Sequence, residues 1–338
     1  MWIGFRADLA GLPVERNNHG QPSLDSDIFQ TMNSTFAMSR RQFLGATAAG
    51  LAAASARPVL AAVSSGTTQN PYPITVFSKA FQELNFEDTA DLVAEVGWDG
   101  IECPVRKGGQ VLPERVEDDL PRFIEALKKL GKRIFFITTD VRDATDPASV
   151  KVLRTAARLG IGHYRLAGWT YRPGKPLPAQ LAELRPVLKD IAALNQELGM
   201  CAGFQNHSGN PNIGAAVWDI YDLIKDLDPR RMGVHFDIGH ATVEGGLIWP
   251  THFQLVAERI TMVYLKDFTW KKAAKGWTVD WCPLGQGMVS PAFFKELKKT
   301  GFAGAINQHH EYPIGEGKER IKILQQDLRT LRQWLELK

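Results

Sequence analysis

Strand-like apolar runs alternate eight times with helix-like stretches, and this repeat limits the possible folds more than any other feature. The repeat begins at Ile74 and continues to the end of the chain, at a spacing of roughly 30 residues. Strands that alternate with helices predict a parallel α/β sheet, and eight such units predict a single closed (β/α)8 barrel, the TIM-barrel architecture. A doubly wound sheet would instead need a glycine-rich phosphate turn after the first strand, where the chain reads Phe77-Ser78-Lys79-Ala80-Phe81.

Hydrophobic periodicity sets the expected bounds of each element. Strands are expected at 74–77, 99–103, 132–138, 163–167, 200–205, 232–237, 260–265 and 303–308. Helices are expected at 86–96, 115–130, 148–159, 178–198, 215–227, around 250–257, at 291–299 and at 318–337. A long loop is expected between the seventh strand and the helix at 291–299.

The N-terminal region has the pattern of an export signal. Ser39-Arg40-Arg41-Gln42-Phe43-Leu44 precedes a stretch rich in alanine and glycine that ends near Ala61-Ala62. A twin-arginine segment, a weakly apolar segment and small residues at a cleavage zone are typical of a twin-arginine signal peptide. We therefore expect four regions: 1–37 as a misassigned start or disordered extension, 38–62 as the signal, 63–73 as a linker, and 74–338 as the barrel. Passage through the twin-arginine translocase would place the folded, cleaved protein in the periplasm.

Charge and cysteine content narrow the function further. The formal net charge of +3 has no clustered source, so neither nucleic acid nor a membrane surface is an expected partner of the mature chain. The three cysteines are far apart in sequence and form no C-x-x-C pair, which argues against a disulfide framework or a cysteine metal site. The oligomeric state is left open.

Polar residues follow five of the strand-like runs, and the carboxyl ends of barrel strands build the active site. They are Glu102 with nearby Arg106, Gln205-Asn206-His207, Asp237 with His240, Lys266, and His309-His310-Glu311. Alternation along the last run directs His309 and Glu311 to one side and His310 to the other. Simpler interpretations remain for several of these residues: Asp237 as a cap of the segment that follows it, His240 as a loop histidine and Lys266 as an ion-paired residue.

The chain resembles the sugar-phosphate isomerase/epimerase superfamily of xylose-isomerase-like TIM barrels between about Ile74 and Glu316. The motifs that carry the resemblance are Gly97-Trp-Asp-Gly-Ile-Glu102, Gln205-Asn-His, Asp237-x-x-His240, Val263-Tyr-Leu-Lys-Asp-Phe268, Pro283-Leu-Gly-Gln-Gly-Met-Val289 and the run from Gly304 to Glu311. Members of that superfamily hold a divalent ion with Glu, Asp, His and Glu on strands five to eight.

The resemblance implies a metal site that this chain alters. At the four ligand positions the chain has Gln205, Asp237, Tyr264 and His309, so only Asp237 keeps its usual identity. We expect Gln205, Asp237 and His309 to reach any bound ion. A set this poor in carboxylates favours manganese or zinc over magnesium, and a metal-free site is equally open.

Three function hypotheses follow from the resemblance and the rim residues. The first is a sugar isomerase or epimerase that removes a proton next to the carbonyl of a sugar or keto sugar, with a lyase acting on an oxidised (3-keto) glycoside as its variant. Its catalytic candidates are Glu102, Glu311, Lys266 and His207, and its substrate-binding candidates are Asn206, His240, Arg106 and Tyr264. The second is a non-catalytic sugar-binding barrel. The third, an abasic-site nuclease, would need a metal-rich site and a basic groove, and the sequence shows neither.

Overall fold

Eight parallel strands close into one barrel in the computed structural model, which describes residues 72–336. Neighbouring strands follow the order β1-β2-β3-β4-β5-β6-β7-β10, and β10 pairs with β1 to complete the ring. The strands are β1 (Ile74–Phe77), β2 (Gly100–Val105), β3 (Arg133–Thr139), β4 (His163–Arg165), β5 (Cys201–Gln205), β6 (Met232–Asp237), β7 (Ile260–Leu265) and β10 (Ala305–Gln308). The predicted (β/α)8 fold is confirmed. The expected signal segment 38–62, the region before it and nearly all of the 63–73 linker lie outside the described residues.

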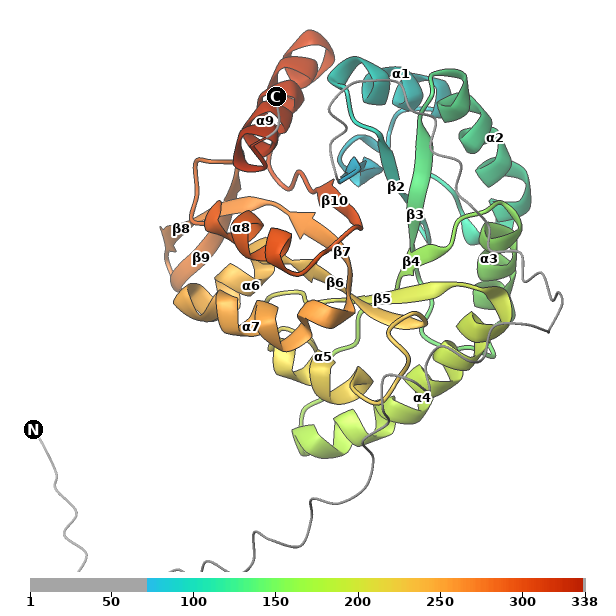
Figure 1. Ribbon diagram of the computed structural model, residues 1–338, viewed down its shortest axis with the longest axis vertical. Coiled ribbons are helices and arrows are strands. Elements are labelled where there is room, and N and C mark those ends of the chain that lie inside the picture. Colours follow the sequence, from blue (N-terminus) through green and yellow to red (C-terminus); the bar gives the residue numbers. More distant parts are fainter. Residues whose placement is uncertain (1–71, 337–338) are drawn as a thin grey trace, which may run out of the picture. The chain divides into compact units, whose positions relative to one another are not determined.

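Helices surround the strands, as Figure 1 shows. They are α1 (Phe86–Val96), α2 (Val116–Lys129), α3 (Pro147–Arg158), α4 (Leu177–Leu198), α5 (Val217–Ile224), α6 (Ile238–Gly245), α7 (Trp249–Val256), α8 (Ala292–Lys299) and α9 (Gly317–Trp334). None of the helices between residues 72 and 336 is both long and apolar enough to cross a bilayer.

Local signals in the sequence account for where these helices begin and end. The Asn85 side chain accepts a hydrogen bond of 2.7 Å from the Asp88 backbone N–H and caps α1, and Asp146 caps α3 in the same way. Gly199 ends α4 with a φ of 69°, a left-handed conformation that glycine adopts without steric cost. The α4 helix therefore stops just before β5.

Two parts of the structure differ from the expected elements. The segment expected as a long loop after β7 is a two-stranded antiparallel hairpin, β8 (Asp267–Ala273) and β9 (Gly276–Cys282), which lies outside the barrel ring in Figure 1. In addition, α6 begins directly after Asp237, where no helix was expected. Both elements extend from the carboxyl ends of strands, the end of the barrel that bears the polar residues.

The barrel interior combines a small apolar cluster with buried polar side chains. Phe136, Met262, Tyr264 and Ala305 form the apolar cluster, separate from the large core between strands and helices. Glu102, His235 and Asn307 lie in the same layer, in register with members of this cluster on neighbouring strands, and have no exposed surface. Close packing in this layer requires Gly203, because a Cβ there would lie 1.9 Å from the His235 ring.

Candidate active site

A cavity of about 290 Å³ opens at the carboxyl ends of the strands. Six of the residues predicted from the sequence line its wall: Arg106, Gln205, His207, Lys266, His309 and Glu311. Its volume is near the lower end of the range for small-molecule sites, about 300–1000 Å³, so it suits a ligand the size of a monosaccharide. The cavity is therefore the candidate active site.

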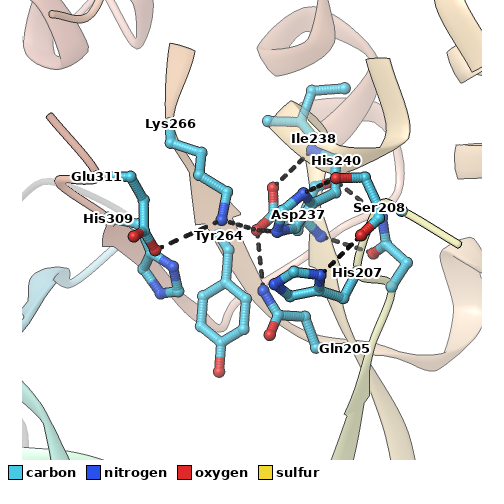
Figure 2. Close-up of polar contacts among 12 residues, drawn as sticks. Gln205, His207, Ser208, Asp237, Ile238, His240, Tyr264, Lys266, His309 and Glu311 are labelled. Atoms are coloured by element: carbon cyan, nitrogen blue, oxygen red, sulfur yellow. Dashed lines mark hydrogen bonds and ion pairs between the residues drawn. The ribbon is translucent and has the colours of Figure 1, made fainter. Parts of the chain in front are cut away.

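Lys266 lies at the centre of the charged groups on one side of the cavity. Its Nζ is 3.2 Å from Asp237 Oδ2 and 3.9 Å from Glu311 Oε1, and Figure 2 shows the amine between the two carboxylates. The Lys266 side chain is only 4% exposed, yet it reaches the cavity wall. The Trp281 ring on β9 lies 4.8 Å from the same amine, so the hairpin covers Lys266 from behind. The Lys266 side chain is thus both ion-paired and directed into the cavity.

Glu311 is the carboxylate that this cluster presents to the cavity. It lines the wall, 28% of its side chain is exposed, and its Oε2 accepts a hydrogen bond of 3.2 Å from Lys79 Nζ. Burial alone would raise the pKa of Glu311, but Lys266, His309 and Lys79 lower it below its ordinary value. Glu311 is therefore ionised at neutral pH and accessible to a ligand.

Glu102 lies deeper than the sequence suggested. It was expected to close its strand, but β2 continues to Val105, and the carboxylate has no exposed surface and no place in the cavity wall. It accepts hydrogen bonds from Thr138, from the Tyr264 hydroxyl at 3.1 Å and from Asn307 Nδ2 at 2.6 Å.

A cation and a histidine complete the surroundings of this carboxylate. Arg165 Nε is 3.4 Å from Glu102 Oε1, and His309 Nε2 is 3.1 Å from Oε2. Burial opposes ionisation, but Arg165, followed by His309 and Thr138, lowers the pKa of Glu102 from 4.5 to about 2. Glu102 is consequently a buried anion at neutral pH, and it orients His309 and Arg165, which both line the cavity.

Three histidines near the cavity remain neutral. Burial, reinforced by Lys266, lowers the pKa of His207 and of His240, and burial is also the largest influence on the pKa of His309. The His207 and His240 rings are 4.0 Å apart, and His240 Nδ1 lies 2.7 Å from Ser208 Oγ. His207 and His309 reach the cavity wall, whereas His240 lies behind it. The two cavity histidines can exchange hydrogen bonds with a ligand as neutral imidazoles.

Three of the residues expected to bind substrate lie outside the cavity wall. Asn206 bonds to both the carbonyl and the N–H of Asp237, which joins the ends of β5 and β6. The Tyr264 hydroxyl is 2.7 Å from His235 Nδ1, inside the barrel, and His240 packs against Trp281. The fourth, Arg106, does line the cavity. The first three support the site from beneath and behind.

The predicted ligand atoms are engaged in ways that do not fit a divalent cation. Gln205 Nε2 donates to Asp237 Oδ2 at 2.9 Å while its Oε1 accepts from Arg165 Nη1 at 2.7 Å. The ammonium of Lys266 contacts the same Asp237 oxygen. Between residues 72 and 336, no three His, Cys, Asp or Glu side chains are grouped so that they could hold a metal ion. Two protein cations, Arg165 and Lys266, occupy the coordination space of Asp237 and Gln205.

Sequence reasoning missed several cavity residues. Arg165, Lys79, Asp140, Arg142, Trp169 and Phe204 all line the wall. Arg165 had a visible signal, since it is a charged residue inside the apolar run His163-Tyr-Arg-Leu-Ala. Asp140 and Arg142 follow the end of β3, the same kind of position that was used to find the other candidates. Lys79 and Trp169 lie in connecting segments, where hydrophobic periodicity does not indicate which side chains point toward the cavity.

The fold and the polar cavity together define a (β/α)8 barrel with a small-molecule site at the carboxyl ends of its strands. The family model described as xylose isomerase-like TIM barrel matches residues 90–334, and the chain belongs to this family. An uncharacterized protein of Methanocaldococcus jannaschii is 26% identical over 129 residues, a match that spans 36% of this chain and 40% of that relative.

Solved structures with the same fold include enzymes that act on sugars. The apo form of 3-keto-D-glucoside 4-epimerase from E. coli superposes with a TM-score of 0.60 and 15% identity, covering 78% of this chain and 99% of that one. A xylose isomerase-like TIM barrel protein from Mycobacterium smegmatis, in complex with magnesium, superposes with a TM-score of 0.56 and 16% identity over 78% and 98% of the two chains. At identities this low, the superpositions establish the shared fold and nothing more.

Proposed function

We propose that this protein is an enzyme of keto-sugar metabolism that removes a proton from the carbon next to a carbonyl, with Glu311 as the base and Lys266 as the electrophile. The observation that carries the proposal is the position of the Lys266 amine, 3.9 Å from Glu311 Oε1 at the wall of the cavity. A carbonyl oxygen and the proton on its neighbouring carbon are separated by a similar short distance. One ligand can therefore meet both groups at once.

The chemistry follows from the charges of the two groups. Glu311 takes the proton, the electrons of the C–H bond move into a carbon–carbon double bond, and the carbonyl oxygen becomes an enolate oxygen. Such an anion is stabilised where a preorganised cation faces it in a site shielded from water. Return of the proton to the other face gives an epimer, and its delivery to the adjacent carbon gives an isomer. Loss of a substituent from the next carbon makes the enzyme a lyase.

Glu311 suits the role of base better than Glu102, the other carboxylate candidate. Glu311 reaches the cavity and stays ionised, whereas Glu102 is enclosed beneath the floor by five neighbours and has a pKa of about 2. We assign Glu102 the positioning of His309 and Arg165. His207 and His309 then orient the sugar hydroxyls as neutral imidazoles.

The donor set supports a mechanism that does not depend on a metal. The carboxylate of Asp237 is neutralised by Lys266, and the amide of Gln205 bridges Asp237 and Arg165. A divalent cation added here would face the Lys266 ammonium and the Arg165 guanidinium, which already contact Asp237 and Gln205. In this proposal the Lys266 ammonium supplies the positive charge that the enolate requires.

Solvent-deuterium exchange into keto sugars tests the proposal directly. Incorporation of deuterium next to the carbonyl is expected with the wild type and is expected to persist undiminished in excess EDTA. Glu311→Gln should slow exchange by about 10²–10⁴-fold, and Lys266→Met by about 10²–10³-fold. Glu316→Gln and Lys271→Met are matched controls at exposed positions and should exchange at the wild-type rate.

The outcomes separate the competing hypotheses. Exchange that survives in both Glu311→Gln and Lys266→Met would remove this mechanism. Exchange that EDTA abolishes would contradict the metal-independent step while leaving the base in place. A protein that binds sugars but exchanges no proton into any of them would be the non-catalytic sugar-binding barrel.

A further inference from the structure

The carboxylates in and beneath the cavity already have partners within the protein. Glu102 pairs with Arg165, Asp237 with Lys266 at 3.2 Å, and Glu311 with Lys79 at 3.2 Å. The fourth, Asp140, accepts a hydrogen bond of 2.7 Å from the Lys107 backbone N–H. Three of the five cations that line the cavity are thus matched by three carboxylates.

Two guanidinium groups in the cavity wall lack a carboxylate partner. Arg106 lies 5.6 Å from the Phe77 ring centroid, and in the part of the chain that the structure describes nothing accepts a hydrogen bond from its guanidinium. Arg142 uses its Nε to donate to the Gly168 carbonyl at 2.8 Å, and its two terminal nitrogens donate to no acceptor among residues 72–336. Both side chains come from segments that follow strands, β2 for Arg106 and β3 for Arg142.

Burial and the neighbouring Arg165 lower the pKa of Arg106, while Glu102, Asp140 and Glu311 act in the opposite direction. Arg165, which lies 4.8 Å from the same Phe77 ring, brings a second positive charge close to Arg106. Phe77 lines the cavity, and both guanidinium groups lie over its ring within cation–π distance. An arginine held this way presents a rigid fork of donors that matches a carboxylate or phosphate in bidentate geometry.

We propose that Arg106, flanked by Arg142, binds an acidic group on the substrate, so that the enzyme acts on an acidic sugar. The proposal rests on the function proposed above and names its substrate class, a keto sugar that bears a carboxylate or a phosphate. The carbonyl end of this substrate faces Lys266 and Glu311, and its acidic end faces Arg106. A neutral sugar of the same size would leave the Arg106 guanidinium without a bidentate acceptor.

Calorimetric titration of the purified protein tests this inference without requiring turnover. The probes are three hexuronates (D-glucuronate, D-galacturonate and D-mannuronate), each measured beside its neutral hexose, together with D-glucose 6-phosphate. At least one acidic sugar is expected to bind at least tenfold more tightly than its neutral counterpart, a difference of about 1.4 kcal/mol. A preference for the glucuronate or for the 6-phosphate identifies which acidic group fits.

The matched pair of variants is Arg106→Met and Arg133→Met. Arg133 also stacks on an aromatic ring, Phe135 at 4.0 Å, but it begins β3 and so lies at the opposite end of the barrel. Arg106→Met should abolish the preference for the acidic sugar while leaving the neutral sugar unaffected, and Arg133→Met should keep the preference. Loss of binding to acidic and neutral sugars alike would point to a general role in shaping the cavity and would overturn the proposal.

Two further results would also overturn it: no acidic sugar binding more tightly than its neutral counterpart, or an undiminished preference in Arg106→Met. The titration is independent of the deuterium-exchange experiment. An acid preference that requires Arg106, in a protein that exchanges no proton, would refute the proposed reaction and keep the anion site. Exchange into neutral keto sugars without an acid preference would support the proposed reaction and refute the anion site.

Discussion

Replacement of Glu102 by glutamine is expected to destabilise the protein strongly, because it leaves the Arg165 charge buried without its partner. The pKa of Glu102 is about 2 against an ordinary 4.5, and at about 1.36 kcal/mol per pKa unit this corresponds to about 3 kcal/mol. Breaking a buried ion pair by removing one partner typically costs about 3–5 kcal/mol. We therefore expect Glu102→Gln to lower the free energy of unfolding by about 3–5 kcal/mol at pH 7.

The same interaction predicts how the difference changes with pH. Because folding lowers the pKa of Glu102, its contribution is fully present above pH 4.5 and is lost as the pH falls toward 2. The difference between wild type and Glu102→Gln should therefore shrink by about 3 kcal/mol across that interval. Urea unfolding followed by tryptophan fluorescence measures this difference at each pH.

A surface pair provides the control for this experiment. Glu117 lies 3.2 Å from Arg158 with both side chains more than half exposed, and Glu117→Gln should change stability by less than about 1 kcal/mol. A Glu102→Gln protein whose stability matches that of the Glu117→Gln control, or whose deficit stays constant between pH 5 and pH 2, would refute the reasoning.

Two other predictions concern the barrel interior and the N-terminal segment. Gly203→Ala is expected to lower the free energy of unfolding by about 3 kcal/mol or more, because its Cβ would lie 1.9 Å from the His235 ring. Gly162→Ala, where a Cβ meets nothing within 4 Å, should stay within about 1 kcal/mol of wild type in the same urea assay. We also propose that the chain is exported to the periplasm, so replacing Arg40 and Arg41 with lysines should retain it in the cytoplasm on cell fractionation; equal periplasmic yield would contradict this.

The fold could be predicted because hydrophobic periodicity and strand–helix alternation carry most of its information. Each of the eight barrel strands overlaps an expected run, and bounds differ by one or two residues at most ends. The β8–β9 hairpin could not be found in this way. Ala274-Lys275 connects its strands without the Asn-Gly or Asp-Gly pair that signals a two-residue turn, and most of its side chains are exposed. Its stability depends on contacts with the barrel that a local pattern does not report.

The candidate site was predicted at the correct end of the barrel but not at the correct depth. Glu102 lies three residues before the end of β2, which at about 3.3 Å per residue places it roughly 10 Å below the strand end. Arg165 was missed because β4 has only three residues, too few for alternation to show that Tyr164 packs outward while Arg165 points inward. The length of a strand and the direction in which its side chains face depend on the neighbouring strands. The cavity residues could therefore be identified only from the structure of the closed barrel.

The charge balance at the strand ends is the basis for our proposal that the site uses protein cations in place of a metal. By the family resemblance, positions 205 and 309 are ligand positions where glutamates would supply two negative charges, and this chain has Gln205 and His309 there instead. Asp237 is then the carboxylate left at that level, and Lys266 already neutralises it at 3.2 Å. Because Gln205 bridges Asp237 to Arg165, the two positive charges of Lys266 and Arg165 are connected through Asp237 and Gln205 along the cavity wall. Loss of the two glutamates thus leaves an electropositive surface whose reactive charge is the Lys266 ammonium, which suits both an enolate oxygen and an acidic sugar.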